Sequence, residues 1–222
     1  MTTIGIIGSG NIGGTVARLA VAGGYDVVVS NSRGPETLKD FTDELGPKAR
    51  AATAAEAAAA GDIVVVSVPF KAFPQLPVAE LAGKVVLDTN NYYQQRDGSF
   101  EALDKGEKTS AQLEQEALGS ARVVKVFNNI YSGHLASLPR PSGSADRSAL
   151  PIAGDDAAAK QTATEFLDAI GYDAVDAGTL ADSWRQEPGT PVYGPPYGTY
   201  GVEAGTPASA DQIRQALAEA KR

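Results

Sequence analysis

A glycine-rich turn lies near the start of the chain, between an apolar segment of strand length and a segment with helical spacing. The apolar segment is Thr3–Ile7, and it leads directly into Gly8-Ser9-Gly10-Asn11-Ile12-Gly13. Apolar residues then recur at Val16, Leu19 and Ala20. A G-x-G-x-x-G sequence in this context is typical of a dinucleotide-binding turn. It predicts a strand–turn–helix unit whose helix N-terminus faces a pyrophosphate.

Three glycines of this turn have separate predicted tasks. Gly8 permits the tight turn, Gly10 lets the backbone approach the pyrophosphate, and Gly13 lets the helix close onto the strand. The residues predicted to contact the nucleotide here are Gly8, Ser9, Gly10, Asn11, Ile12 and Gly13.

The loop after the second predicted strand, Tyr25–Ser30, indicates which dinucleotide is bound. An NAD site usually carries an acidic residue about twenty residues after the first glycines. Here Asn31, Ser32 and Arg33 follow the strand, and the first carboxylate is Glu36. Arg33 can clamp a 2′-phosphate or stack on the adenine, and Asn31 and Ser32 can donate hydrogen bonds. The alternative is a polar loop with one solvated arginine; the sequence favours NADP(H) over NAD(H).

Strand and helix patterns alternate along most of the chain. Asp62–Val68 is a continuous β-branched run, which is typical of a parallel strand buried on both faces. Thr53 is expected to cap an alanine helix, Ala54–Ala60, that Gly61 ends. Further strands are predicted at Ala49–Ala52, Lys84–Asp88, Arg122–Phe127, Ala149–Ala153 and Tyr172–Asp176, and further helices at Pro35–Leu45, Thr109–Leu118 and Asp156–Ile170. The alternation predicts an α/β fold: a Rossmann-type, doubly wound, mostly parallel sheet with a small C-terminal extension.

We expect residues 1–180 to form the NADP-binding Rossmann domain, with residues 181–222 in the same globular unit. The second part begins with a Pro/Gly/Tyr-rich segment, Pro188–Gly201, and ends in a helix within Ala208–Arg222. The segment has no helical or strand period, yet it is too aromatic for a simple linker. It is a lid over the crevice, a contact with a second subunit, or disordered.

Composition excludes several classes of protein. The 222 residues carry a net charge of −8, which disfavours nucleic acid and anionic membranes as partners. The absence of cysteine and the single histidine argue against a disulfide framework and a metal cluster. No apolar run approaches a membrane span, and the chain starts in a strand rather than in a signal segment. We expect a soluble, cytoplasmic, homodimeric protein that binds small-molecule cofactors and no metal.

In an open α/β sheet, ligands lie beyond the carboxyl ends of the strands. Four such ends are predicted to meet at one crevice: Gly8–Ile12, Ser67–Phe70, Asp88–Asn91 and Phe127–Ile130. An apolar wall beside the nicotinamide ribose is expected from Val68, Pro69 and Phe70.

Polar groups for the ring edges are expected at the same strand ends. The candidates are Asn90, Asn91, Asn128 and Asn129, although turn chemistry is the other explanation for asparagines at these places.

Hydride transfer between two bound rings needs close stacking and exclusion of water more than a protein acid or base. No catalytic triad is evident. The single histidine, His134, lies in the predicted loop Ile130–Leu135 on the acceptor side, where it can hydrogen-bond the acceptor or relay its proton. His134 and Asn129 are the predicted catalytic residues; the alternative for His134 is a structural or inert role.

This set of motifs resembles the NADP oxidoreductases that use the deazaflavin coenzyme F420. The resemblance covers about the first four-fifths of the chain and is carried by Ile6–Gly13, Ser30–Gly34, Ser67–Pro69, Asp88–Asn91, Lys125–Asn129 and Ile152–Asp156. It implies reversible hydride transfer between NADPH and the 8-hydroxy-5-deazaflavin, with FMN or FAD as possible acceptors. The fold also resembles the cytosolic flavin and ferric reductase domain of some membrane metalloreductases.

Two other functions stay open from the sequence. One is an NADPH-dependent reductase of a small carbonyl or imine, or of a ferric or flavin acceptor. Enzymes of the carbonyl and imine type usually add a large helical substrate domain, for which few residues follow Ile170. The other is a non-catalytic NADP-sensing module whose acceptor crevice is filled or blocked.

Overall fold

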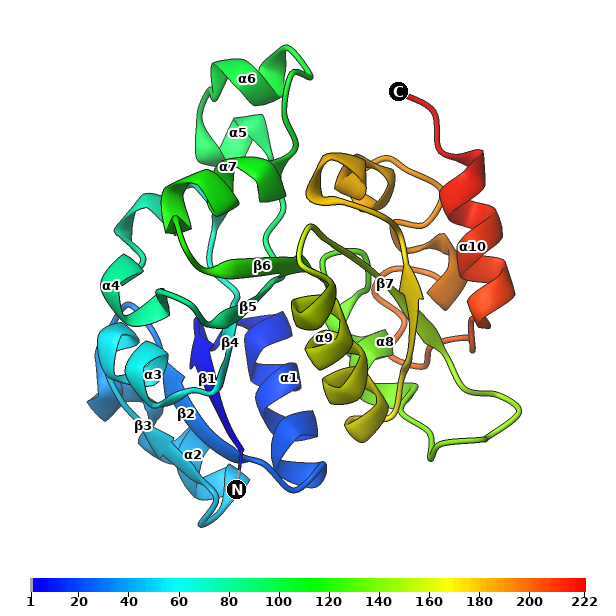
Figure 1. Cartoon of the computed structure of the whole chain (residues 1–222). Helices are drawn as coiled ribbons and strands as arrows, with labels where there is room; N and C mark the ends of the chain where they lie inside the picture. The colour runs from blue at the N-terminus through cyan, green and yellow to red at the C-terminus, as the bar shows by residue number, and fades with distance from the viewer. Residues whose placement is uncertain (1) are drawn as a thin grey trace.

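Parallel strands dominate the protein, whose computed structural model describes residues 2–222. They form one sheet in the order β3-β2-β1-β4-β5-β6-β7-β8, in which only the β6–β7 pair is antiparallel (Figure 1). The strands are β1 (Thr3–Ile7), β2 (Asp26–Ser30), β3 (Ala49–Ala51), β4 (Ile63–Val66), β5 (Val85–Asp88), β6 (Arg122–Lys125), β7 (Ala149–Gly154) and β8 (Asp173–Asp176). The predicted doubly wound α/β fold is confirmed.

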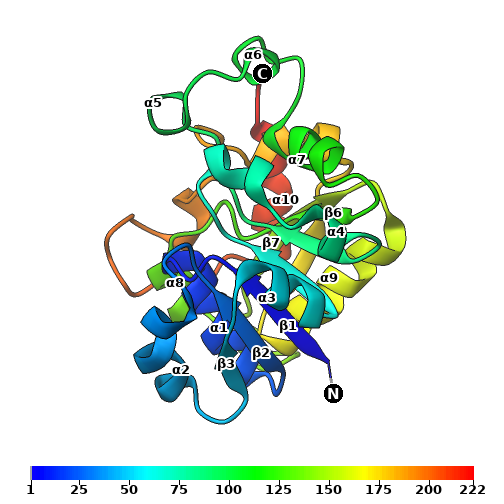
Figure 2. The ribbon, with the colours of Figure 1, turned by 90° about the vertical axis from the view of Figure 1, so that its left-hand side faces the viewer.

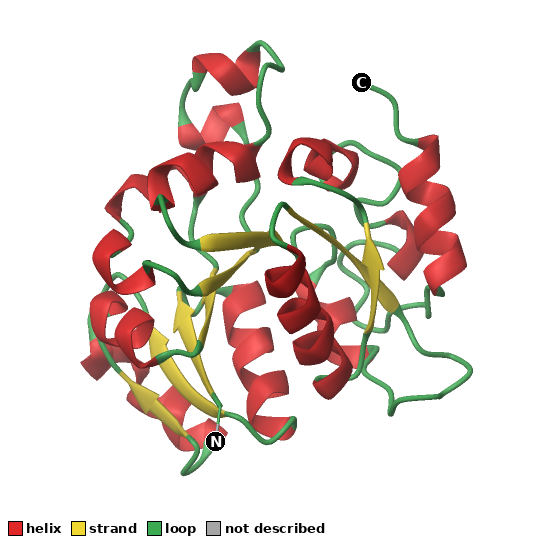
Figure 3. Ribbon diagram, viewed as in Figure 1, coloured by secondary structure: helices red, strands yellow, loops and turns green. Residues whose placement is uncertain are grey.

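Helices cover both faces of this sheet (Figure 3). Alternate residues of β4 show the two faces: Ile63 and Val65 join the apolar cluster of α1 (Asn11–Ala22) and α9 (Ala157–Ala169). Val64 and Val66 join a separate cluster with α4 (Val78–Leu81) and α7 (Ser110–Leu118). The β-branched run is therefore buried on both sides, as its sequence indicates.

The remaining helices are short. They are η1 (Pro35–Leu38), α2 (Lys39–Leu45), α3 (Ala54–Ala60), η2 (Phe70–Gln75), α5 (Gln94–Asp97), α6 (Glu101–Asp104), α8 (Ser132–Ser137), η3 (Leu180–Gln186), η4 (Pro195–Tyr197) and α10 (Ala210–Glu219), where η marks a 3₁₀ helix. The predicted helix Pro35–Leu45 is thus divided between η1 and α2. Figure 2 shows α5 and α6 standing apart from the sheet in the excursion between β5 and α7. Within residues 2–222, no helix has the length and apolarity needed to cross a membrane.

Side-chain caps set the ends of several helices. Thr53 and Glu56 form a reciprocal capping box at the start of α3, and Gly61 follows its last residue. The predicted start and end of this helix are confirmed. Asp156 accepts a hydrogen bond from the Ala159 N–H at the start of α9, so this carboxylate caps the helix.

The strand β6 ends two residues earlier than predicted. Phe127 has φ +64°, a left-handed conformation that no other non-glycine residue between positions 2 and 222 adopts. Such a backbone costs energy and persists only where the surroundings enforce it. The fully buried Phe127 ring provides that enforcement, and the chain turns sharply toward α8.

The aromatic segment after β8 packs onto the body of the protein. Val192 and Tyr197 are fully buried, and the Tyr197 hydroxyl donates to the Ala149 carbonyl at the start of β7. The Gly194 N–H donates to the Asn129 carbonyl. Beyond this segment α10 lies against β7 and β8, and in Figure 1 the helices α9 and α10 flank β7.

Candidate active site

The glycine turn joins β1 to α1 with the three predicted tasks visible in its geometry. Gly8 has φ +102°, and a Cβ there would lie 2.1 Å from the Ser67 carbonyl oxygen. A Cβ on Gly13 would lie 1.9 Å from the Gly8 carbonyl oxygen, so α1 closes directly onto the turn. A Cβ on Gly10 would meet nothing within 4 Å. Gly10 therefore leaves open space beside the backbone where a pyrophosphate fits.

No side-chain cap and no first-turn carboxylate balances the partial positive charge at the N-terminus of α1. Its cap residue, Gly10, makes no side-chain capping bond, and the first turn contains no acidic residue. The first N–H groups of a helix have no partner within the helix and carry the positive end of its dipole. Together with the open space at Gly10, this helix end fits a dinucleotide pyrophosphate.

One groove leads from the turn to the loop after β2. This groove, which we call the adenosine groove, has a volume of about 510 Å³ and is lined by Gly8–Gly10, Ser30–Arg33, Ser67–Pro69 and part of Ala72–Pro77. Ser32 and Arg33 are exposed at its edge.

Asn31 shapes the loop of the adenosine groove. Its Oδ1 accepts the N–H groups of Arg33 and Gly34, and its Nδ2 donates to Thr37. The second hydrogen of Nδ2 is left over, so the expected hydrogen bond from this side chain to the phosphate stays a prediction.

A second cavity of about 390 Å³, the ring chamber, continues from the adenosine groove. The two share Gly10 and Ser67–Pro69. The ring chamber is lined from all four predicted strand ends, which contribute Gly10–Ile12, Ser67–Pro69, Thr89–Asn91, and Asn128 with Ile130. Strand order reverses between β1 and β4, so the two cavities lie where ligands bind in folds of this type.

The apolar wall of the ring chamber consists of Val68 and Pro69, without Phe70. Phe70 is 0% exposed, and its ring packs against those of Phe73 and Phe100 with centroids 4.8 and 5.0 Å away. Its expected place beside the nicotinamide ribose is wrong because η2 begins at this residue and Phe70 joins the cluster under α7.

Asn90 and Asn128 line the ring chamber, but internal hydrogen bonds occupy their side chains. Asn90 accepts the Val68 N–H at 2.9 Å and donates to Glu114 at 2.7 Å. The Nδ2 of Asn128 donates to the Gln186 carbonyl at 2.7 Å, and its Oδ1 accepts from the Gln186 amide at 2.9 Å. These bonds hold the chamber walls in place, and the expectation that the two amides bind a ring edge stays a prediction.

A buried ionic cluster holds Asn90 in place: Glu114 accepts from its side chain, and Lys125 donates to its carbonyl. This cluster was not predicted from the sequence. Lys125 and Asp88 form an ion pair at 2.8 Å with both side chains fully buried. Burial raises the pKa of the Glu114 carboxyl well above its usual value, and the nearby Asp88 raises it further, which favours the protonated form. A lysine inside the apolar predicted strand Arg122–Phe127 was the signal that could have revealed this cluster.

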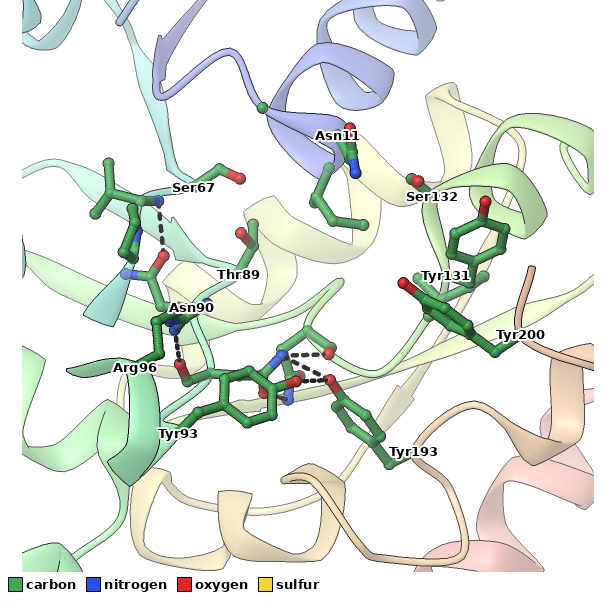
Figure 4. A pocket seen from close by; sticks show the side chains of 17 residues that line it. Asn11, Ser67, Thr89, Asn90, Tyr93, Arg96, Tyr131, Ser132, Tyr193 and Tyr200 are labelled. Atoms are coloured by element: carbon green, nitrogen blue, oxygen red, sulfur yellow. Dashed lines mark hydrogen bonds between the residues drawn. The ribbon is translucent and has the colours of Figure 1, made fainter. Parts of the chain in front are cut away.

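Four tyrosines line the ring chamber, and the sequence left Tyr93 and Tyr193 among them without an individual role (Figure 4). The hydroxyls of Tyr93 and Tyr193 hydrogen-bond each other, and Asn91 Nδ2 donates to Tyr193 at 3.2 Å. Two hydroxyls that share one hydrogen bond retain one further O–H, which can face a ligand. Burial and the bond with Tyr93 raise the pKa of Tyr193, so the Tyr193 hydroxyl stays protonated.

A second pair of tyrosines closes another side of the chamber. The rings of Tyr131 and Tyr200 lie side by side with centroids 4.7 Å apart, and Tyr200 is 83% exposed (Figure 4). Arg96 also lines the chamber, and its guanidinium pairs with Asp97.

His134 lies in the helix α8 rather than in a surface loop, and it is only 1% exposed. Asn129 is also 1% exposed. Neither residue lines the ring chamber; they lie together on a neighbouring cavity. Across residues 2–222, no group of three or more acidic or histidine side chains is placed to hold a metal.

We compared the chain with known proteins, and its N-terminal part matches the model of one protein family. Residues 3–92, which contain the glycine turn and the Arg33 loop, match the model of the family described as NADP oxidoreductase, coenzyme F420-dependent. The chain is 30% identical over 186 residues to the metalloreductase STEAP3 of Rattus norvegicus, covering 83% of this chain and 35% of that protein. It is 45% identical over 53 residues to the protein YjhV of Escherichia coli K12, covering 24% of this chain and 39% of that one. The chain therefore spans well under half the length of either relative.

Two solved structures have the same fold over most of the chain. The protein SMa0349 of Sinorhizobium meliloti has a TM-score of 0.75 at 29% identity, over 94% of this chain and 97% of that one. A protein of Arthrobacter sp. FB24, proposed to be an F420-dependent NADP reductase, has a TM-score of 0.69 over 83% and 87% of the two chains. Its 23% identity shows a common fold only.

Proposed function

We propose that this chain, a member of the coenzyme F420-dependent NADP oxidoreductase family, transfers a hydride between NADPH and a deazaflavin of the F420 type. The observation that carries the proposal is the continuity of the adenosine groove with the ring chamber through Gly10 and Ser67–Pro69. One end of this path has the features of a phosphorylated adenosine site, and the other is a chamber with aromatic side chains for a second ring.

Three parts of the protein are assigned to the nucleotide. Arg33 holds the 2′-phosphate at the edge of the adenosine groove. The N-terminus of α1 holds the pyrophosphate in the space beside Gly10. Val68 and Pro69 support the nicotinamide end, and Asn90 fixes this wall by accepting the Val68 N–H. None of these residues needs to exchange a proton.

The reaction consumes one proton besides the hydride. Bound NADPH would supply a hydride, which is one proton with two electrons, to the oxidised deazaflavin and would leave as NADP⁺; the second proton of the reduced deazaflavin would come from solvent. As the hydride arrives, negative charge develops on the acceptor ring, and the free O–H of the Tyr93–Tyr193 pair is placed to donate a hydrogen bond to it.

The acceptor is assigned from the shape and chemistry of the chamber. Its lining contains three aromatic residues besides Tyr93, namely Tyr131, Tyr193 and Tyr200. Arg96 is the single cationic residue among the lining residues and can receive an anionic substituent of the acceptor. A flat heterocycle with a charged tail fits this chemistry better than a small carbonyl or imine.

Anaerobic rapid mixing tests the proposal. The protein and NADPH are combined with deazaflavin, with FMN or with a cyclic imine, and nicotinamide oxidation is followed by absorbance. We expect deazaflavin to be reduced fastest and FMN more slowly, with no oxidation by the imine. The same mixtures with NADH in place of NADPH serve as the control for cofactor choice. Oxidation by the imine alone, or by none of the acceptors, would overturn the proposal.

A further inference from the structure

A cavity of about 420 Å³ opens beside the ring chamber and shares Ile130, Tyr131, Tyr193 and Tyr200 with it. We call it the His134 pocket, because His134 lies on its wall together with Asn129. A ligand in the ring chamber can therefore extend into this pocket past the three tyrosines.

Two residues of the His134 pocket carry buried polar atoms without partners. Both ring nitrogens of His134 and the Oδ1 of Asn129 are buried and make no hydrogen bond within the described chain. Leaving such a group unsatisfied is costly, so native proteins rarely do so. Three unsatisfied atoms on two residues that line one cavity indicate that a bound molecule supplies their partners.

The direction of the Asn129 amide is fixed by its neighbours. Its Nδ2 donates to the Val192 carbonyl at 3.0 Å and to the Tyr197 hydroxyl at 3.3 Å. A carbonyl can only accept, so the amide cannot be flipped, and the atom left over is an acceptor. The partner at this point must carry an N–H or an O–H.

The pocket selects for an uncharged, partly apolar ligand. None of its lining residues is acidic or carries a permanent positive charge; besides His134 and Asn129 they are aromatic, aliphatic, proline or glycine. The Tyr131 ring meets the His134 ring edge-on, with centroids 5.3 Å apart. A charged group would lose its hydration here without an ion partner.

We propose that the His134 pocket is the subsite for the far edge of the hydride acceptor, and that it binds a neutral, flat heterocycle edge bearing an N–H or O–H. Asn129 accepts from that edge, and His134 supplies the second hydrogen bond. This inference rests on the proposed function and makes both residues positioning residues, not proton donors. It also separates the acceptor into a neutral edge in this pocket and an anionic part near Arg96.

The lone histidine of the chain makes the proposal measurable by NMR. Untagged, ¹⁵N-labelled protein saturated with NADP⁺ has imidazole signals from His134 alone. Lumichrome, a neutral flat heterocycle with an N–H edge, is the probe, and its affinity is measured by fluorescence. We expect lumichrome to bind and to shift the imidazole nitrogen signals. Binding without such a shift, or no binding, overturns the inference.

Two variants give the test a second readout. His134→Phe keeps a flat ring but removes both nitrogens, and we expect it to weaken lumichrome binding about tenfold while NADP⁺ affinity stays unchanged. Ala136→Ser, at an exposed position of the same helix, is the matched control, and its lumichrome affinity should equal that of the unchanged protein. Equal affinities for all three proteins would overturn the inference.

Failure of this inference is distinguishable from failure of the proposed function. If NADPH reduces the deazaflavin but His134 does not respond to lumichrome, only the assignment of the pocket is lost. If NADP⁺ itself does not bind, the proposed function falls as well.

Discussion

At the scale of single residues, the proposed preference for NADPH rests on one exposed arginine. Arg33 lies at the edge of the adenosine groove, and no ion pair within residues 2–222 occupies its guanidinium. The loop below it is already ordered by Asn31, so little conformational freedom is lost when a phosphate binds.

We expect the Arg33→Ala substitution to weaken NADPH binding about 10- to 100-fold, because it removes a pair of charge-assisted hydrogen bonds to the 2′-phosphate. Binding of NADH should be unchanged, because NADH has no 2′-phosphate. Calorimetry with both nucleotides measures this difference. Arg50→Ala, an exposed arginine outside the groove, is the matched control. Equal losses for NADPH and NADH would contradict the assigned role.

The sequence predicted the residues whose roles depend on the local backbone. The tight turn at Gly8 and the close approach of the helix at Gly13 follow from one short sequence and are confirmed, whereas the approach of a pyrophosphate to Gly10 stays a prediction. It did not predict the hydrogen bonds of Asn90 and Asn128, because their partners, Glu114 and Gln186, are distant in the sequence. The wrong expectation for Phe70 has the same origin: the aromatic cluster that buries it assembles only in the folded chain.

At the scale of elements, the site depends on how closely α1 approaches β1 and β4. Gly13 allows this approach, whereas Gly10 leaves space for the ligand. The same substitution at the two positions should therefore separate folding from binding.

We expect Gly13→Ala to lower the free energy of unfolding by about 3 kcal/mol, because its Cβ would meet the Gly8 carbonyl oxygen. Gly10→Ala should cost less than about 1 kcal/mol, since its Cβ meets nothing in the protein. It should nevertheless weaken NADPH binding at least about tenfold by occupying the space of the pyrophosphate. Urea unfolding and nucleotide titration check both variants. A stable Gly13→Ala protein, or full affinity in Gly10→Ala, would refute this division.

Element types could be read from the sequence more reliably than their ends. The strand β6 was predicted to reach Phe127, but a left-handed residue ends it at Lys125. The placement of His134 in a loop was wrong for a related reason: the turn after β6 is short, and α8 begins at Ser132.

At the scale of the whole molecule, the acceptor side is assembled from distant parts of the chain. Tyr93 follows β5, Tyr131 follows β6, and Tyr193 comes from the segment after β8. No sequence pattern links such positions, which explains why the sequence analysis found the nucleotide half of the site and only part of the acceptor half.

Nucleotide binding should stabilise the whole fold, because the adenosine groove and the ring chamber are lined from β1, β2, β4, β5 and β6. At about 100 times its Kd, a ligand that binds only the folded protein adds about 2.7 kcal/mol. For a domain of this size we expect NADP⁺ to raise the Tm by about 5–10 °C. Thermal unfolding with matched concentrations of NADP⁺ and NAD⁺ tests this. An equal rise with NAD⁺ would contradict the preference for the phosphorylated nucleotide.

The strand direction reverses between β6 and β7, and this reversal separates the two halves of the site along the chain. Because β7 and β8 run opposite to the nucleotide-binding strands, the backbone leaving β8 must travel back across the protein before Tyr193 reaches the ring chamber. This returning stretch supplies Tyr193 and Tyr200 to the proposed acceptor side, whereas the glycine turn and the Arg33 loop lie in the first third of the chain. We expect an exchange of residues 188–201 for those of a homologue to change the oxidant that the protein reduces, while its affinity for NADPH stays the same.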